Sequence, residues 1–224
     1  MLTIASIDDP QVQRVLRDLH RSARKDWSIF LRAAPAVLAG MLRGQSLTAS
    51  LAPRLADAYI PVNPEVGRLL YLTALVCGAK RVVEFGTSFG ISTIYLAAAM
   101  QEAGGMVYGT EIEPQKIAQA RINIQLAGLS DHAEVLAGDA LETLRDIDAP
   151  VDMVLLDGWK DLYIPILNLL RPHLRPGSIV LADNIHTFRK ELAPYVAMMR
   201  DPANGFRSAT LSIGSGIEYS VFAG

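Results

Sequence analysis

Residues 81–92 read RVVEFGTSFGIS, and this stretch decides the fold. Its first part, Arg81–Phe85, is an apolar run with the length of a buried β-strand, and Gly86–Gly90 has the small residues of a tight turn. Ile91–Met100 then gives an alanine-rich, apolar helix. A strand that turns directly into a helix is the repeating unit of a parallel sheet, so the stretch predicts an α/β protein.

The same alternation of strand and helix continues on both sides of this stretch. We expect strands at Met106–Glu111, Ala133–Leu136, Asp152–Asp157 and Ser178–Asp183. We expect helices at 64–78, at Pro114–Ala127, at Ala140–Arg145, in a segment that ends near Arg171, and at Phe188–Arg200. The final segments, Phe206–Ser212 and Ile217–Phe222, flank a glycine-containing turn and predict a hairpin. The sequence therefore predicts a doubly wound, mostly parallel sheet that ends in an antiparallel hairpin.

The first sixty residues follow another pattern, and we interpret 1–60 as an N-terminal helical extension of a main domain at 61–224. Asp9-Pro10 is typical of a helix start, and further helical stretches are expected at Ala36–Leu42 and Leu47–Tyr59. The extension is interpreted either as a cap over a substrate or as a contact in a homodimer. One helical face carries four arginines, which fit an anion site or a solvated face with Arg14 paired to Asp18: Arg14, Arg17, Arg21 and Arg24.

Composition excludes several other classes of protein. The 224 residues fit one domain with a covered core, and a net charge of −2 gives no electrostatic footprint for nucleic acid. A single cysteine, Cys77, excludes a disulfide framework and a thiolate metal site. No apolar run approaches the roughly 18 residues of a membrane span, and the first residues lack the pattern of a signal peptide. We expect a cytoplasmic protein without a membrane or nucleic-acid partner.

Three acidic residues follow or end successive strands, where open parallel sheets bind their ligands. Glu84 is a carboxylate in an apolar strand and needs a partner, which a ligand ammonium would supply. Glu111 lies 25 positions after Gly86, where an acid can accept hydrogen bonds from ribose hydroxyls. Asp139 either faces an adenine amino group or serves as a helix N-cap. The Gly-x-x-x-Gly spacing of 86–90 differs from the Gly-x-Gly-x-x-Gly that binds a pyrophosphate.

A second group of polar residues ends the fourth and fifth expected strands. If these strands are neighbours, Asp157, Asp183 and the amide oxygen of Asn184 converge, because adjacent strands lie roughly 5 Å apart. Two carboxylates held so close repel each other, and a cation relieves the repulsion. Oxygen ligands select a hard ion, Mg²⁺ first, with Mn²⁺ or Ca²⁺ as alternatives. The competing interpretation treats both acids as unrelated helix caps.

These motifs resemble those of the class I S-adenosylmethionine-dependent methyltransferases over residues 61–222. EFGTSFG at 84–90 is similar to the first motif of that superfamily, and TEIEP at 110–114 is similar to the second. The resemblance implies a Rossmann-like methyltransferase fold, a seven-stranded sheet with an antiparallel last strand, and S-adenosylmethionine as the cofactor. The implied cofactor-binding residues are Val62, Glu84, Gly86, Ser88, Ser92, Glu111, Asp139, Ala140, Asp157 and Trp159.

Two further segments, DGWKDLY at 157–163 and ADN at 182–184, closely resemble the cation-dependent catechol and caffeoyl-CoA O-methyltransferases. The resemblance implies that Asp157, Asp183 and Asn184 bind the metal and that Lys160 is the general base. Asp157 and Asn184 would then serve catalysis as well as metal binding, and Trp159 would line the adenine pocket. A phenol is mostly neutral at pH 7, and a divalent ion lowers its pKa. We therefore expect methyl transfer to a hydroxyl of a small catechol-like phenol.

Two alternatives fit parts of the same sequence. An NAD-type Rossmann oxidoreductase also has acids at strand ends, although the glycine spacing and the terminal hairpin count against it. A catalytically silent S-adenosylmethionine-binding module would keep the cofactor residues, although the intact pattern at 157–160 and 183–184 counts against that reading. The sequence identifies neither the acceptor nor a role for His186 or Glu218.

Overall fold

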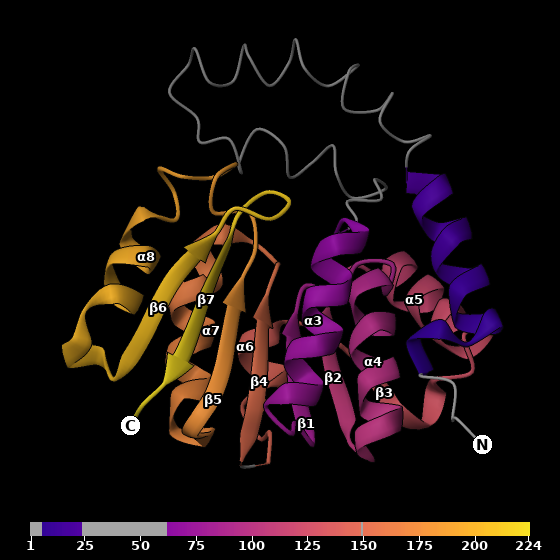
Figure 1. The fold of residues 1–224 in the computed structure, drawn as a ribbon, viewed down its shortest axis with the longest axis horizontal. Coiled ribbons are helices and arrows are strands. Elements are labelled where there is room, and N and C mark those ends of the chain that lie inside the picture. Colours follow the sequence, from indigo (N-terminus) through magenta and orange to yellow (C-terminus); the bar gives the residue numbers. More distant parts are fainter. Residues whose placement is uncertain (1–5, 24–61, 149) are drawn as a thin grey trace, which may run out of the picture.

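A computed structural model describes residues 6–23, 62–148 and 150–224 of the chain (Figure 1). Within these residues, seven strands form one sheet in the order β3-β2-β1-β4-β5-β7-β6. All neighbouring pairs from β3 to β5 are parallel, whereas β7 is antiparallel to both β5 and β6. The strands are β1 (Arg81–Phe85), β2 (Met106–Glu111), β3 (Ala133–Ala137), β4 (Val151–Leu156), β5 (Leu174–Ala182), β6 (Phe206–Leu211) and β7 (Ile217–Phe222).

Helices cover both faces of this sheet (Figure 1). A helix over residues 10–23 lies on one face with α3 (Pro64–Val76), α4 (Ile91–Ala103) and α5 (Pro114–Leu126). The opposite face carries α6 (Ala140–Thr143), α7 (Tyr163–Leu170) and α8 (Ala193–Arg200). The predicted doubly wound sheet with its antiparallel terminal hairpin is therefore confirmed.

The alternation of side chains along the strands builds two apolar cores. In β4, Met153 and Leu155 join the core under α3 and α4, while Val154 and Leu156 join the core under α6 to α8. Every residue of this strand is buried, as a central parallel strand requires. Burial of an apolar side chain of this size contributes roughly 1.5–3 kcal/mol to the stability of the fold. The two cores therefore fix the register of the strands, which in turn places the residues at the ends of the strands.

Some predicted boundaries were wrong. The helix predicted at Phe188–Arg200 begins at Ala193, because Pro194 has no amide hydrogen to donate and fits only the first helical turn. β5 begins at Leu174 instead of Ser178, with an irregular register opposite β4. The helix predicted at Ala140–Arg145 is a single turn that ends at Thr143.

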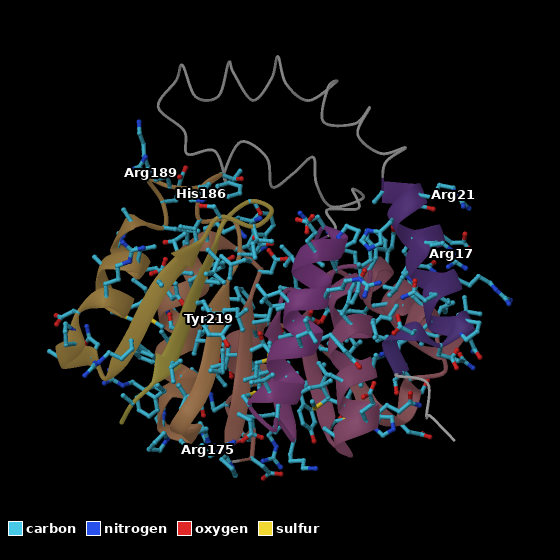
Figure 2. The ribbon with its side chains drawn as sticks, in the orientation of Figure 1. Arg17, Arg21, Arg175, His186, Arg189 and Tyr219 are labelled. Atoms are coloured by element: carbon cyan, nitrogen blue, oxygen red, sulfur yellow. The ribbon has the colours of Figure 1, made fainter. Side chains whose placement is uncertain are left out.

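The N-terminal extension is described in part. The Asp9 carboxylate accepts a hydrogen bond from the Gln11 amide at 2.7 Å, so the predicted N-cap is confirmed. Asp18 pairs with Arg21 at 2.9 Å and not with Arg14, and the side chains of Arg17 and Arg21 point outward from the helix (Figure 2). The stretches predicted at Ala36–Leu42 and Leu47–Tyr59, with Arg24, lie outside the described residues. Among the described helices, none has both the length and the apolar character needed to span a membrane.

Candidate active site

Polar residues gather at the carboxyl ends of β1, β4 and β5, the edge toward which the parallel strands point (Figure 1). A cavity of about 330 Å³ opens at this edge, between residues 62–66, the ends of β4 and β5, and the turn at 214–215. Figure 2 places His186 and Arg189 at the same end, whereas Arg175 lies at the opposite end. This edge is where open parallel sheets bind ligands, so the cavity is the candidate site.

The two acids that follow β4 and β5 come together as the sequence predicted. The strands pair in parallel with Leu156 opposite Ala182, and the Asp183 amide donates to the Leu156 carbonyl oxygen at 3.0 Å. Burial and the charge of Asp183 raise the pKa of Asp157 well above its usual value, against the opposing effect of Lys160. Burial likewise raises the pKa of Asp183. The two acids therefore line one cavity, and their role as metal ligands stays a prediction.

Asn184 completes this group through an unusual backbone conformation. Its φ of +68° lies in the left-handed region, which asparagine tolerates better than most residues. Its backbone amide donates to Asp183 Oδ1 at 2.5 Å, and its side-chain Nδ2 donates to Ser215 Oγ at 2.8 Å. Because Nδ2 is engaged, Oδ1 is the atom of this amide that remains for a ligand.

The residues of the predicted metal site, Asp157, Asp183 and Asn184, offer only oxygen ligands to the cavity. Two carboxylates that disfavour each other's charge and an amide oxygen are the hard ligands that Mg²⁺, Mn²⁺ or Ca²⁺ prefer. Clusters of three or more His, Cys, Asp or Glu suited to a metal do not occur in the described ranges. The set formed by Asp157, Asp183 and Asn184 fits a hard divalent cation, and the other positions would be filled by acceptor oxygens or water.

Lys160 is buried beside these acids, with its ammonium group held on several sides. Nζ donates to the Gly158 carbonyl oxygen at 2.9 Å and to the Tyr163 hydroxyl at 2.8 Å, and it lies 3.7 Å from Asp157 Oδ1. The Tyr163 hydroxyl donates in turn to the Asp183 carbonyl oxygen at 3.2 Å. Burial lowers the pKa of Lys160, although the charges of Asp157 and Asp183 act to raise it. Lys160 is therefore held inside the site and is only 8% exposed to solvent.

Glu84 lies fully buried on β1, as its place in an apolar strand predicted. Oε2 accepts hydrogen bonds from the hydroxyls of Thr87 at 3.0 Å and Thr93 at 2.5 Å. Oε1 is buried and has no hydrogen-bond partner among the residues described. Burial raises the pKa of Glu84, and the hydroxyls of Ser92, Thr93 and Thr87 act in the opposite direction. An unpaired buried carboxylate oxygen is costly, which fits the predicted role of receiving a ligand ammonium directly or through water.

The turn after β1 brings backbone close to the candidate cofactor region. Gly86 has a φ of +100°, and a Cβ there would lie 2.6 Å from the backbone nitrogen of Gly158. Ser88 has a φ of +49°, and its amide donates to Glu111 Oε2 at 2.8 Å. Glu111 Oε1 also accepts from the next two backbone amides, at 2.8 and 3.0 Å. The predicted ribose acceptor is thus fixed in place at the end of β2.

The remaining predicted cofactor residues lie along the same edge. The Asp139 side chain accepts from the Leu141 amide at 2.9 Å, so the N-cap interpretation is confirmed, and contact with an adenine stays a prediction. Ala140 begins α6, and Ser92 is buried in the first turn of α4 beside Glu84. Val62 lines the cavity, and Trp159 is 39% exposed directly after β4.

Two residues that contact the site were missed in the sequence. Tyr163 lies three positions after Lys160, a helical spacing that could have suggested contact. Ser215 reaches Asp183 across 32 residues, and no local pattern indicates it. Glu218, left open before, is buried in a network with Arg200 at 2.8 Å and so serves the β6–β7 hairpin. His186 is exposed, and its Nε2 lies 3.4 Å from the Ser212 hydroxyl oxygen.

Parts of the chain are similar to known methyltransferases. A family model described as a methyltransferase domain matches residues 83–185. The chain is 34% identical over 138 residues to a catechol O-methyltransferase of Niastella koreensis, covering 58% of this chain and 62% of that protein. It is 35% identical over 127 residues to a catechol O-methyltransferase of Mycobacterium tuberculosis, covering 56% and 57%. The matched part thus spans about three fifths of the length of these two relatives.

A solved structure extends the comparison over more of the chain. The O-methyltransferase TomG from Streptomyces achromogenes, which is involved in tomaymycin synthesis, was crystallised in complex with S-adenosylmethionine. It matches with a TM-score of 0.69 at 25% identity, covering 78% of this chain and 87% of that one. The seven-stranded fold described above is therefore one on which S-adenosylmethionine is bound in a related enzyme.

Proposed function

We propose that this chain is a class I O-methyltransferase of the catechol and caffeoyl-CoA type, and that it methylates a hydroxyl oxygen of a small catechol-like acceptor. S-adenosylmethionine is the proposed methyl donor, and a divalent cation is the proposed partner of the acceptor oxygens. The observation that carries this proposal is the meeting of Asp157, Asp183 and Asn184 at one cavity, with Lys160 buried beside them.

The cofactor is proposed to bind along the turn after β1. Glu84 would receive the ammonium group at its unpaired Oε1, and Gly86 lets the turn pack closely against the backbone of Gly158. Glu111, fixed by three backbone amides, would accept hydrogen bonds from the ribose hydroxyls. Asp139 and Trp159 lie further along the edge and would contact the adenine. S-adenosylmethionine supplies a methyl group already activated on a positively charged sulfur.

The cation is proposed to bind Asp157, Asp183 and Asn184, where its positive charge would lower the pKa of a neighbouring acceptor hydroxyl. An acceptor with two adjacent oxygens suits this site best, because both oxygens can approach the same ion. Such binding also fixes the orientation of the reacting hydroxyl, which is a large part of catalysis in transfer reactions.

Lys160 is proposed to take the acceptor proton at Nζ. A neutral lysine amine has two N–H bonds and one lone pair, and the two bonds donate to the Gly158 carbonyl and the Tyr163 hydroxyl. The lone pair of this neutral amine would then be available to take the proton of the acceptor hydroxyl. Burial favours this neutral form, and the nearby Asp157 carboxylate stabilises the ammonium that results from proton transfer.

The test uses two separate variants, Asp183→Ala and Lys160→Ala. Methyl transfer by each variant is measured on a panel of catechols in the presence of Mg²⁺. We expect Asp183→Ala to abolish cation-dependent turnover while S-adenosylhomocysteine still binds, and Lys160→Ala to lower kcat by about 100-fold or more. Full wild-type activity in excess EDTA would exclude the cation mechanism.

Cofactor specificity separates the alternatives. Quenching of tryptophan fluorescence by S-adenosylhomocysteine and not by NADH is expected, and the reverse would favour an oxidoreductase. Tight cofactor binding with no methyl transfer to any phenol would favour the silent module.

A further inference from the structure

We propose that Ser215 is a positioning residue that orients Asp183 and Asn184 toward a divalent cation, an inference that rests on the proposed function. Ser215 lies in the turn between β6 and β7, far along the chain from Asp183 and Asn184. Its side chain lines the cavity without being one of the residues in the predicted ligand set.

One hydroxyl connects two of the proposed ligands. Ser215 Oγ donates its hydrogen to Asp183 Oδ1 at 2.7 Å and accepts a hydrogen from Asn184 Nδ2 at 2.8 Å. A serine hydroxyl has a single hydrogen, so the direction of both bonds is fixed once that hydrogen goes to the carboxylate. The Asn184 amide must then turn its nitrogen toward Ser215, which leaves Oδ1 as its ligand atom.

The same hydroxyl selects one oxygen of Asp183. Oδ1 already accepts from the Asn184 backbone amide at 2.5 Å and from Ser215. Oδ2 is the oxygen with capacity left for a cation, so we expect Asp183 to bind through that single atom. Without the Ser215 hydroxyl, both side chains could rotate and present the wrong atoms.

The backbone holds Ser215 at this position. The His186 amide donates to the Ser215 carbonyl oxygen at 2.8 Å, and the Ile185 amide donates to the Gly216 carbonyl oxygen at 3.0 Å. Gly216 has a φ of +88°, and a Cβ there would lie 2.6 Å from the His186 ring. The turn is thus joined directly to the segment after β5, and Ser215 moves with Asp183 and Asn184.

The test measures binding of Mn²⁺ alone to the full chain, from the free-ion signal in electron paramagnetic resonance. Ser215→Ala removes the hydroxyl, and the pair Ser215→Thr and Ser215→Val has the same shape with and without it. We expect Ala and Val to weaken Mn²⁺ binding about 10-fold or more, as for other residues that orient metal ligands, and Thr to stay within about threefold of wild type. Ser212→Ala, in the same segment between β6 and β7, is the control and should bind Mn²⁺ like wild type.

Two further readouts separate positioning from a merely structural role. The Mn²⁺ concentration for half-maximal rate should rise in the Ala and Val variants more than kcat falls, while S-adenosylhomocysteine affinity stays unchanged. Should the Ala variant fail to fold, the Thr and Val pair decides.

Equal Mn²⁺ affinity in wild type, Thr and Val would overturn the role of Ser215 and leave the proposed function standing. A wild-type protein that binds S-adenosylhomocysteine and no Mn²⁺ would overturn the cation site and the role of Ser215 together.

Discussion

Replacing Tyr163 by phenylalanine removes one hydroxyl from the site and leaves the ring in place. That hydroxyl accepts from Lys160 Nζ at 2.8 Å and donates to the Asp183 carbonyl oxygen at 3.2 Å. The ring, fully buried, packs at right angles to the rings of Phe85 and Tyr195, with centroids 6.5 and 5.6 Å away. The substitution therefore changes the polar connection between Lys160 and Asp183 and almost nothing else.

The size of the effect follows from the bonds that are lost. A hydrogen bond to a charged group contributes about 1.5–3 kcal/mol, so kcat should fall by about 10- to 150-fold if Tyr163 holds Nζ in the transition state. The free energy of unfolding should fall by about 2–3 kcal/mol, because the Asp183 carbonyl oxygen also loses its donor.

The assay is methyl transfer at saturating cofactor and Mg²⁺, with urea unfolding measured in parallel. Tyr195→Phe is the matched control, because the Tyr195 hydroxyl is buried without a hydrogen-bond partner among the described residues. Its removal should keep kcat and leave stability equal or higher by up to about 1 kcal/mol. A Tyr163→Phe enzyme with wild-type kcat would refute the positioning of Lys160, and equal losses in both variants would assign the effect to packing.

Three further predictions concern the base, the glycine turn and the sheet core. Burial lowers the pKa of Lys160, and the base must be deprotonated to act. We therefore expect kcat/KM to be lost as pH falls through a midpoint below the usual lysine value of about 10.4. In Lys160→Ala this acidic fall should be absent from the pH profile of single-turnover rates. In Gly86→Ala the new Cβ would lie 2.6 Å from backbone, so we expect S-adenosylhomocysteine binding, measured by calorimetry, to weaken about 10-fold or more. Gly78→Ala is the control, because the space around Gly78 is open. It should lower the free energy of unfolding by about 1–2 kcal/mol and leave the affinity for S-adenosylhomocysteine unchanged. Asp152→Ala should lower the unfolding free energy by about 2–4 kcal/mol in urea at pH 7, and Asp148→Ala by less than about 0.5 kcal/mol.

The pH dependence of the Asp152 effect has a definite sign. Burial acts to raise the pKa of Asp152, but hydrogen bonds from the Lys80 and Arg81 amides and from Arg175 outweigh it and lower the pKa. A lowered folded-state pKa gives stability that is present above the unfolded value of about 3.9 and is lost as pH falls through the folded value. The difference between wild type and Asp152→Ala should therefore shrink in acid, and a constant difference from pH 7 to pH 3 would contradict this account.

Most of the fold could be predicted from the sequence because its signals are local. Strand Arg81–Phe85, the turn after it and helix α4 follow from apolar runs and glycines that any neighbourhood would favour. The start of α8 could not be placed from the apolar pattern alone, since residues 187–192 form turns and Pro194 fits only the first turn of a helix.

The sequence by itself determined which strands carry acids at their ends and that Asp157 and Asp183 suit a hard ion, because side-chain chemistry and the position of each strand along the chain are local features. Only the tertiary structure decided which oxygen of Asp183 is engaged, that the Tyr163 hydroxyl links Lys160 to Asp183, and that Ser215 joins Asp183 to Asn184. The physical reason is that Tyr163 and Ser215 reach Asp183 from a helix and a hairpin turn that the sheet places beside the end of β5, and no sequence spacing encodes these two contacts.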